Sequence, residues 1–160
     1  MMVGRNSPCW CGSGAKLNRC HLHRDVLRRP AVHLGRVGPL RSVPAAIARP
    51  PYALDPPTWP LPEPQILSGS ALERMRHAGR VAAEVLAETV AAVRVGVTTD
   101  ELDAVAHDAY VARGAYPSTL GYHGFPKSIC TSVNEALCHG IPADRPLPAR
   151  DIVNTHVPAH

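Results

Sequence analysis

Four side chains near the start of the sequence are of types that bind zinc. They are three thiols and one imidazole within thirteen residues: Cys9, Cys11, Cys20 and His21. This is the ligand set of a closed, tetrahedral structural zinc site. The Gly12-Ser13-Gly14 turn lets the backbone fold tightly between the ligand pairs, and zinc would supply folding free energy that so short a segment cannot gain by burial. His23 is an alternative ligand, and free cysteines in an unstructured tail are the alternative to the whole site.

A second set of residues could form an apolar binding slot. Tyr122 and Phe125 supply aromatic rings and Cys130 a thiol, a combination suited to a thioether side chain. His139 lies between Cys138 and a glycine on a short β-type run, so its ring could project into a cleft. Core aromatic residues and a surface histidine are the simpler interpretation of the same side chains. Cys138 is expected to be a buried, apolar thiol.

Two capping boxes predict where helices begin ahead of these residues. Ser70 with Glu73, and Thr98 with Glu101, have the spacing at which both side chains satisfy the first amides of a helix. Apolar residues then recur every three or four positions, which places them on one face. Glycines at positions 96 and 114 end the two helical patterns.

Short runs of β-forming residues follow the helices. They cover 129–133, 136–138 and 152–157. Two helices followed by strands indicate an α+β domain.

The chain divides into three zones by composition. Residues 7–24 form the cysteine-rich unit, residues 25–65 a Pro- and Arg-rich linker, and residues 66–160 the globular part. Ten of the 17 prolines lie between Pro30 and Pro64, which favours an irregular or polyproline-like connector along the surface of the body.

Charge is divided unevenly between the two ends. Residues 1–50 contain nine Lys and Arg against one acidic residue, whereas residues 51–160 contain eight against twelve. The basic front indicates an anionic partner, with nucleic acid as the first candidate and a merely soluble basic tail as the alternative. The sequence has no apolar run long enough for a signal peptide or a membrane span. We therefore expect a cytoplasmic protein, with reduced cysteines and no membrane partner.

The front segment resembles a known zinc knuckle. Residues 8–21, with their Cys-x-Cys-Gly-Ser-Gly start and Cys-His end, are similar to the knuckle at the carboxyl end of the bacterial preprotein translocase motor. Knuckles of this kind are docking surfaces, so the resemblance implies binding to a protein or a ribosome.

The body resembles type I methionine aminopeptidases. Residues 114–142 read GAYPSTLGYHGFPKSICTSVNEALCHGIP, which is close to the central signature of that family. The resemblance implies the first half of a pita-bread α+β domain and removal of the initiator methionine from nascent polypeptides. The complete enzyme holds two divalent cations (cobalt, manganese, iron or zinc) through two Asp, one His and two Glu. A hydroxide that bridges them attacks the scissile carbonyl. We expect a monomer.

The same resemblance assigns roles to individual residues. His139 falls on the histidine that hydrogen-bonds the substrate at the scissile amide and is the one catalytic residue expected here. The residues expected to line the methionine side-chain pocket are Thr119, Tyr122, Phe125 and Cys130, with His123 at its rim.

The sequence departs from the family near residue 156. Residues 150–156 read RDIVNTH, and His156 stands at the position of the first metal-binding Asp. Asp151 matches a non-ligand Asp of the family, and the other four ligands would lie beyond residue 160. An imidazole cannot bridge two ions as a carboxylate does. We therefore expect a truncated, inactive aminopeptidase; the alternative is a non-catalytic module that docks on a ribosome or protein through its knuckle.

Overall fold

The computed structural model describes residues 6–9, 14–20, 35–59 and 66–160. The chain forms two compact units, Met1–His33 and Leu34–His160, and each is described by itself. Within the described ranges, no helix is both long and apolar enough to cross a membrane.

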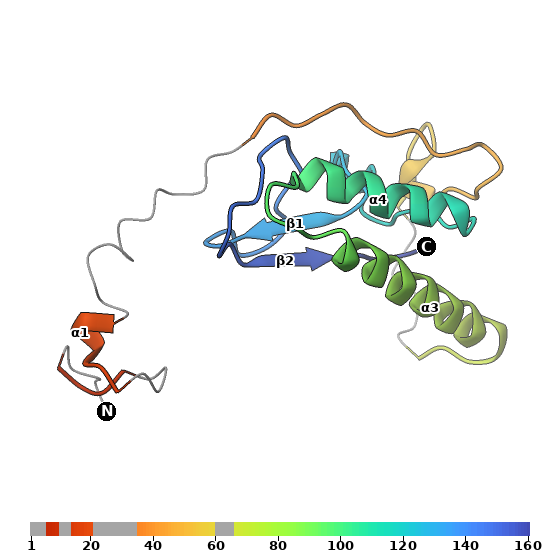
Figure 1. The fold of residues 1–160 in the computed structure, drawn as a ribbon. Coiled ribbons are helices and arrows are strands. Elements are labelled where there is room, and N and C mark those ends of the chain that lie inside the picture. The colour runs from red at the N-terminus through yellow and green to blue at the C-terminus, as the bar shows by residue number, and fades with distance from the viewer. Residues whose placement is uncertain (1–5, 10–13, 21–34, 60–65) are drawn as a thin grey trace. The chain divides into compact units, whose positions relative to one another are not determined.

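The first unit contains a short closed turn. A bridge joins Pro8 to Lys16, and the Cys9 amide donates to the Ala15 carbonyl at 2.9 Å. The one-turn helix α1 (Leu17–Cys20) follows directly (Figure 1). These contacts hold residues 7–9 beside residues 15–17.

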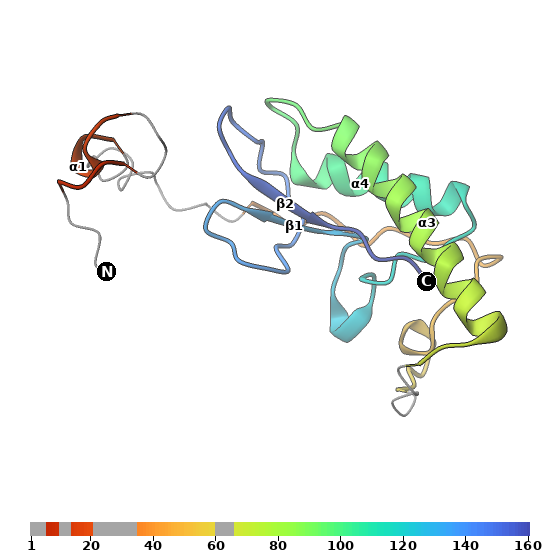
Figure 2. The ribbon, with the colours of Figure 1, turned by 90° about the horizontal axis from the view of Figure 1, so that it is seen from below.

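The described part of the second unit combines two long helices with a two-stranded antiparallel sheet. The helices are α3 (Gly69–Ala91) and α4 (Thr99–Ala112), and the strands are β1 (Cys130–Val133) and β2 (Val153–His156). Figures 1 and 2 show α3 alongside α4, and the two strands side by side. The expected α+β class is confirmed, and both strands fall within predicted runs.

The helix α4 begins as its sequence predicts. The Thr98 hydroxyl accepts from the Glu101 amide at 3.1 Å, and the Glu101 carboxylate accepts from the Thr98 amide at 2.7 Å. Both halves of the capping box are therefore present.

The capping box predicted at Ser70–Glu73 is wrong. Helix α3 begins directly after Ser68, whose side chain makes no capping hydrogen bond. Ser70 already lies inside the first turn, and its hydroxyl accepts from Arg74 at 3.4 Å. The helix also ends before Gly96, whose amide donates to the Leu147 carbonyl at 2.8 Å.

The strand expected at 136–138 is also wrong. Asn134 adopts a left-handed conformation with φ 53° directly after β1, and the chain turns there. The Ala136 amide donates to the Val133 carbonyl at 3.1 Å, which closes a turn where the pattern predicted extended chain.

Residues 35–59 are the part of the expected 25–65 linker that the structure describes before Ile66, and they pack on the body. Val43 and Ile47 are buried against Tyr116 and Leu120 in one apolar cluster. The segment also contains the short 3-10 helix η1 (Pro51–Ala53), whose Tyr52 and Ala53 pack on the same cluster.

The residues after β2 pair with the loop that follows α4. Tyr116 and His160 exchange both backbone hydrogen bonds at 3.0 Å, and the Ser118 amide donates to the Pro158 carbonyl at 3.1 Å. Pro158 has no N–H, so it contributes only its carbonyl, which also accepts from the Tyr110 hydroxyl at 2.8 Å. These bonds fix the position of Ser118, the residue directly before Thr119 of the predicted pocket.

Candidate functional site

The residues predicted to bind substrate surround one cavity of about 730 Å³. They come from the loop after α4, from β1 and from the turn beyond it, and they are Thr119, Tyr122, His123, Phe125, Cys130 and His139. Tyr52 from η1, Ile141 and His156 also line this cavity. The fold therefore brings together every residue of the predicted pocket, and their roles in binding remain predictions.

A tight turn presents the aromatic residues of the cavity. Gly121 has φ 81° and its amide donates to the Phe125 carbonyl at 2.8 Å, which closes the turn around η2 (Tyr122–Gly124). His123 has φ 46°, a left-handed conformation that is unfavourable for a residue with a Cβ. The Thr119 hydroxyl donates to the Lys127 carbonyl at 3.0 Å across the base of the loop.

Cys130 supplies an apolar part of the wall. It is buried and opens β1, where it pairs with His156 of β2. Burial raises the pKa of its thiol to about 11, so the thiol stays protonated near neutral pH. A protonated, buried thiol contacts a ligand as a soft apolar group and does not act as a nucleophile.

The exposed residue His139 is positioned by an unusually close backbone approach. Its own φ is 53°, and the carbonyl of the next residue, Gly140, accepts from the Thr131 amide at 2.8 Å. A Cβ at position 140 would lie 2.2 Å from the Thr131 carbonyl oxygen, so only glycine fits. Cys138, predicted to be buried, is exposed, because it belongs to the turn and not to a strand.

His139 and His156 face one another inside the cavity. Their ring centroids are 6.4 Å apart and the planes differ by 24°. In the part of the chain that the structure describes, no group of three or more His, Cys, Asp or Glu side chains could hold a metal ion. Asp151, which begins this stretch, accepts from Arg145 at 2.8 Å and from Asn134 at 2.9 Å. The residues present therefore do not fit a two-ion carboxylate site.

The predicted zinc knuckle is only partly covered by the structure. Cys9 is buried and Cys20 is half-buried, and Cys9 is held by its hydrogen bond to the Ala15 carbonyl, shortly before α1. Cys11 and His21 lie outside the described residues, so the four-ligand site stays a prediction.

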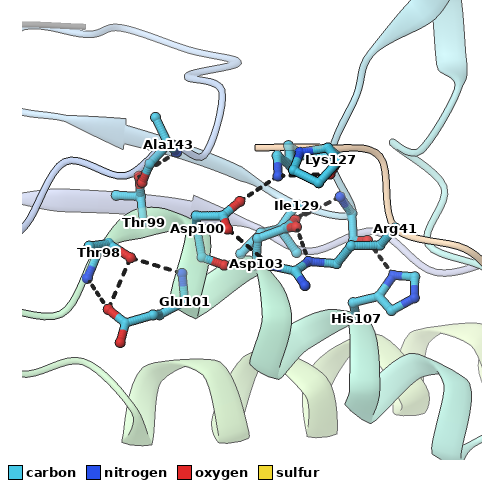
Figure 3. Close-up of polar contacts among 12 residues, drawn as sticks. Arg41, Thr98, Thr99, Asp100, Glu101, Asp103, His107, Lys127, Ile129 and Ala143 are labelled. Carbon is cyan, nitrogen blue, oxygen red and sulfur yellow. Dashed lines mark hydrogen bonds and ion pairs between the residues drawn. The ribbon is translucent and has the colours of Figure 1, made fainter. Parts of the chain in front are cut away.

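A network of buried and half-buried charged groups lies between α4 and the residues directly before β1 (Figure 3). The Asp103 carboxylate is fully buried and accepts from the amides of Ser128 at 2.7 Å and Ile129 at 3.2 Å. It also accepts from Arg41 Nε at 3.0 Å. Burial raises the pKa of the Asp103 carboxyl, and the hydrogen bonds from Arg41 and the Ser128 amide oppose that rise.

Three further side chains extend the network. The ammonium group of Lys127 is buried, forms an ion pair with Asp100 and donates to the Pro39 carbonyl at 3.4 Å. The His107 ring contacts the Ser128 hydroxyl at 2.8 Å and the Ser42 carbonyl at 3.0 Å. The network thus fixes residues 127–129, directly before Cys130, on one side and the segment 35–59 on the other.

Sequence reasoning missed this network, although a signal for it was present. Asp103 and His107 are spaced like Ala106 and Tyr110 on the buried stripe of α4. Two polar residues at helical spacing on a buried face must find partners, because an unpaired buried charge is costly.

Comparison with known proteins identifies the family. The sequence profile of metallopeptidase family M24 matches residues 73–160, and the SEC-C motif matches residues 5–22. The chain belongs to metallopeptidase family M24.

Its similar relatives within the family are named methionine aminopeptidases. It is 52% identical to methionine aminopeptidase 2 of Mycobacterium tuberculosis over 132 residues, which are 82% of this chain and 46% of the relative. It is 50% identical to mitochondrial methionine aminopeptidase 1D of Dictyostelium discoideum over 77% of this chain and 31% of that relative.

Solved structures agree with the sequence comparison. The chain is similar to methionine aminopeptidase from Rickettsia prowazekii, with a TM-score of 0.54 and 46% identity over 55% of this chain and 36% of that one. It is also similar to the Thermotoga maritima enzyme, with a TM-score of 0.58 and 29% identity over 59% of this chain and 39% of that one. The chain thus spans less than half the length of each of these relatives. The expected pita-bread relationship is confirmed over this part.

Proposed function

We propose that this chain is the methionine-binding part of a cytosolic methionine aminopeptidase, which acts on nascent polypeptides that begin with methionine. The observation that supports the proposal most is that the six residues predicted from the signature within 114–142 all line one cavity of about 730 Å³. A cavity of that size is ample for a methionine side chain and its peptide.

The chemistry of the wall suits a thioether. The rings of Tyr122 and Phe125 and the protonated thiol of Cys130 offer polarizable, apolar contacts, which sulfur favours. His139, exposed on its turn, would hydrogen-bond the peptide at the bond to be cleaved. Thr119 and His123 complete the wall and the rim.

Hydrolysis is not proposed for residues 1–160 alone. The family is a metallopeptidase family, and its divalent cations (cobalt, manganese, iron or zinc) require a group of ligands that the described residues do not form. His156 stands where the first carboxylate is expected. We therefore propose that this polypeptide binds a methionyl peptide without cleaving it.

A binding experiment tests this proposal. Met-Ala-Ser and Ala-Ala-Ser would be titrated into the purified chain and followed by ligand-observed NMR. We expect Met-Ala-Ser to bind at least about tenfold more tightly, because the methionine side chain would be buried in the cavity. Equal affinity for the two peptides would contradict the proposal. Leu54→Ala, a half-exposed position that does not line the cavity, is a suitable control.

A second candidate function concerns the front of the chain. The SEC-C match at residues 5–22 and the excess of basic residues within 1–50 favour a zinc-stabilised module that docks on ribosomal RNA or a ribosomal protein. One zinc ion per chain is expected, with Cys9, Cys11, Cys20 and His21 as ligands. Metal analysis of the full chain tests this, and an unchanged zinc content in Cys20→Ser would exclude the site.

Docking is tested separately. Co-sedimentation of the chain with ribosomes should weaken as salt is raised, because basic side chains release counterions from phosphates. Deletion of residues 1–33, the first compact unit, should abolish it, whereas a longer deletion would also remove Arg41, Val43 and Ile47 from the body. Co-sedimentation that persists after this deletion would show that another part of the chain makes the contact.

A further inference from the structure

Four rings form a continuous cluster at the rim of the cavity. Two of them, Tyr122 and His123, belong to the predicted pocket. The other two, Tyr52 and Trp59, come from the segment 35–59. Trp59 stacks on His123 with a centroid distance of 4.3 Å and an interplanar angle of 11°, and it meets the Tyr122 ring edge-on at 5.6 Å. Tyr52 meets Tyr122 edge-on at 5.2 Å and lies 5.9 Å from Trp59 in a stacked arrangement.

The turn that carries Tyr122 and His123 needs outside support. His123 sits in the left-handed region at φ 46°, between Gly121 at φ 81° and Gly124 at φ 80°. A non-glycine residue in that region costs on the order of 1 kcal/mol, and the flanking glycines leave the backbone free to adopt other conformations. The Gly121–Phe125 hydrogen bond closes the turn from within, and contacts from outside the turn add to the selection of this conformation. The only aromatic partners of His123 among the described residues are Trp59 and its neighbour Tyr122.

The segment that provides this support is itself firmly attached. Arg41 forms ion pairs with Asp100 at 3.1 Å and with the buried Asp103 at 3.0 Å. The Tyr52 hydroxyl donates to the Ser118 carbonyl at 2.7 Å, next to Thr119 of the cavity wall. Burial raises the pKa of the Tyr52 phenol to about 12, which keeps this donor protonated at every physiological pH. Tyr52 is therefore a fixed part of the wall.

We infer that Trp59 is a positioning residue that holds the Tyr122–His123 turn, and that Tyr52 and Trp59 together make the segment 35–59 a permanent part of the substrate cavity. The inference rests on the proposed function for the substrate, a methionyl peptide. Trp59 acts through Tyr122 and His123, whereas Tyr52 lines the cavity itself. Without the Trp59 ring, the turn would lose the stack that selects the conformation of His123, and the rim would widen.

The first test needs no ligand. The purified full chain is compared with Trp59→Ala, Trp59→Phe and the control Leu54→Ala by proton NMR of the histidine rings. The His123 signals are identified by their loss in His123→Gln. An indole stacked at 4.3 Å shifts these protons upfield through its ring current. Trp59→Ala should therefore move them downfield, Trp59→Phe should move them less, and Leu54→Ala should not move them. Unchanged His123 signals in Trp59→Ala would overturn the inference.

The second test measures the dissociation constant of Met-Ala-Ser for the same variants. Trp59→Ala should weaken binding about three- to tenfold, the range typical of an aromatic pair, and Trp59→Phe should restore most of it. Because Trp59 is 50% exposed, the melting temperature should change little. Equal binding by Trp59→Ala and the unsubstituted chain would overturn the inference while the proposed function stands. Failure of the unsubstituted chain to bind Met-Ala-Ser would overturn the proposed function, and the histidine shifts would then decide whether Trp59 packs on the His123 ring, on which its positioning role depends.

Discussion

The ring of His139 lies nearly parallel to the ring of His156, with their centroids 6.4 Å apart across the cavity. One of these residues is expected to hydrogen-bond a substrate, and the other stands where the family is expected to place a metal-binding carboxylate. His139 therefore fits the role expected from the family, whereas His156 does not supply the carboxylate expected at its position.

The histidine at the expected carboxylate position should prevent catalysis. Residues 1–160 should release no methionine from Met-Ala-Ser with cobalt, manganese, iron or zinc added, because the described residues form no group that could hold a metal ion. His156→Asp should also be inactive, since it would supply one carboxylate of the five ligands expected. Full-length methionine aminopeptidase 2 of Mycobacterium tuberculosis is the positive control. Methionine release within about tenfold of that control would contradict the prediction.

Thiol reactivity reports on the cavity wall. Cys130 is 3% exposed and the pKa of its thiol is raised to about 11, so very little thiolate is present at pH 8. Iodoacetamide should therefore modify the exposed Cys138 far faster than Cys130, as followed by peptide mass spectrometry. A raised pKa moves ionisation of the thiol to higher pH. The rate at which iodoacetamide modifies Cys130 should therefore rise about tenfold for each pH unit between pH 7 and 9. Equal rates for the two thiols in the folded chain, as expected in denaturant, would show that Cys130 is not buried.

The start of α4 should make stability depend on acidity. Hydrogen bonds from the Thr98 amide and hydroxyl lower the pKa of the Glu101 carboxyl from its usual 4.5. A lowered folded-state pKa contributes stability above the unfolded value, and this contribution is lost as the pH falls through the folded value. In urea unfolding, Glu101→Gln should therefore reduce the loss of stability below about pH 4.5. Thr98→Ala should cost about 1 kcal/mol at pH 7.

A matched control is available for this prediction in α3. Glu73 belongs to a capping box that does not form, because the N-cap Ser68 makes no side-chain hydrogen bond. Glu73 instead pairs with Arg76 at 2.6 Å, so Glu73→Gln removes an exposed helix carboxylate without removing a cap. A similar change in both variants would mean that acid sensitivity comes from charge alone and not from the cap.

The buried network should dominate the stability of the second unit. Arg41→Ala would remove the cation from a fully buried Asp103 and should lower the free energy of unfolding by roughly 2–4 kcal/mol. Arg36→Ala is the matched control, because Arg36 and its partner Asp144 are both well exposed, and it should cost less than about 0.5 kcal/mol. Urea unfolding measures both. Equal costs would show that burial of Asp103 does not determine the effect.

Sequence patterns predicted what depends on neighbours along the chain. The Thr98–Glu101 box identified the start of α4, because capping needs only residues within one turn. The same pattern at Ser70 failed because the helix begins two residues earlier, with Ser68 as its N-cap, and local spacing does not determine which serine is the cap. The 136–138 strand failed for a similar reason: β-forming residues need a partner strand, and Asn134 turns the chain before one is reached.

The residues of the candidate site also fall into two groups: those that a local pattern indicated and those that it did not. A contiguous signature within residues 114–142 indicated Tyr122, Phe125, Cys130 and His139, and all of them line the cavity. Trp59 carries no local signal, because its stacking partner lies 64 residues further along the chain. The ion pair of Arg41 with Asp103 likewise spans 62 residues. Contacts of this kind are determined by the folded topology, which a single sequence does not display.

The ion pairs of Arg41 have a consequence for synthesis on the ribosome. Arg41 leaves the exit tunnel well before Asp100 and Asp103, and the amides of Ser128 and Ile129 follow later still. Until those amides emerge, the Asp103 carboxylate must remain solvated by water. Among these contacts the Tyr116–His160 pairing can form latest, because His160 is the last of these residues to emerge. The second unit therefore cannot fold progressively from its first residues and should close late, in one slow step dominated by contacts between distant residues.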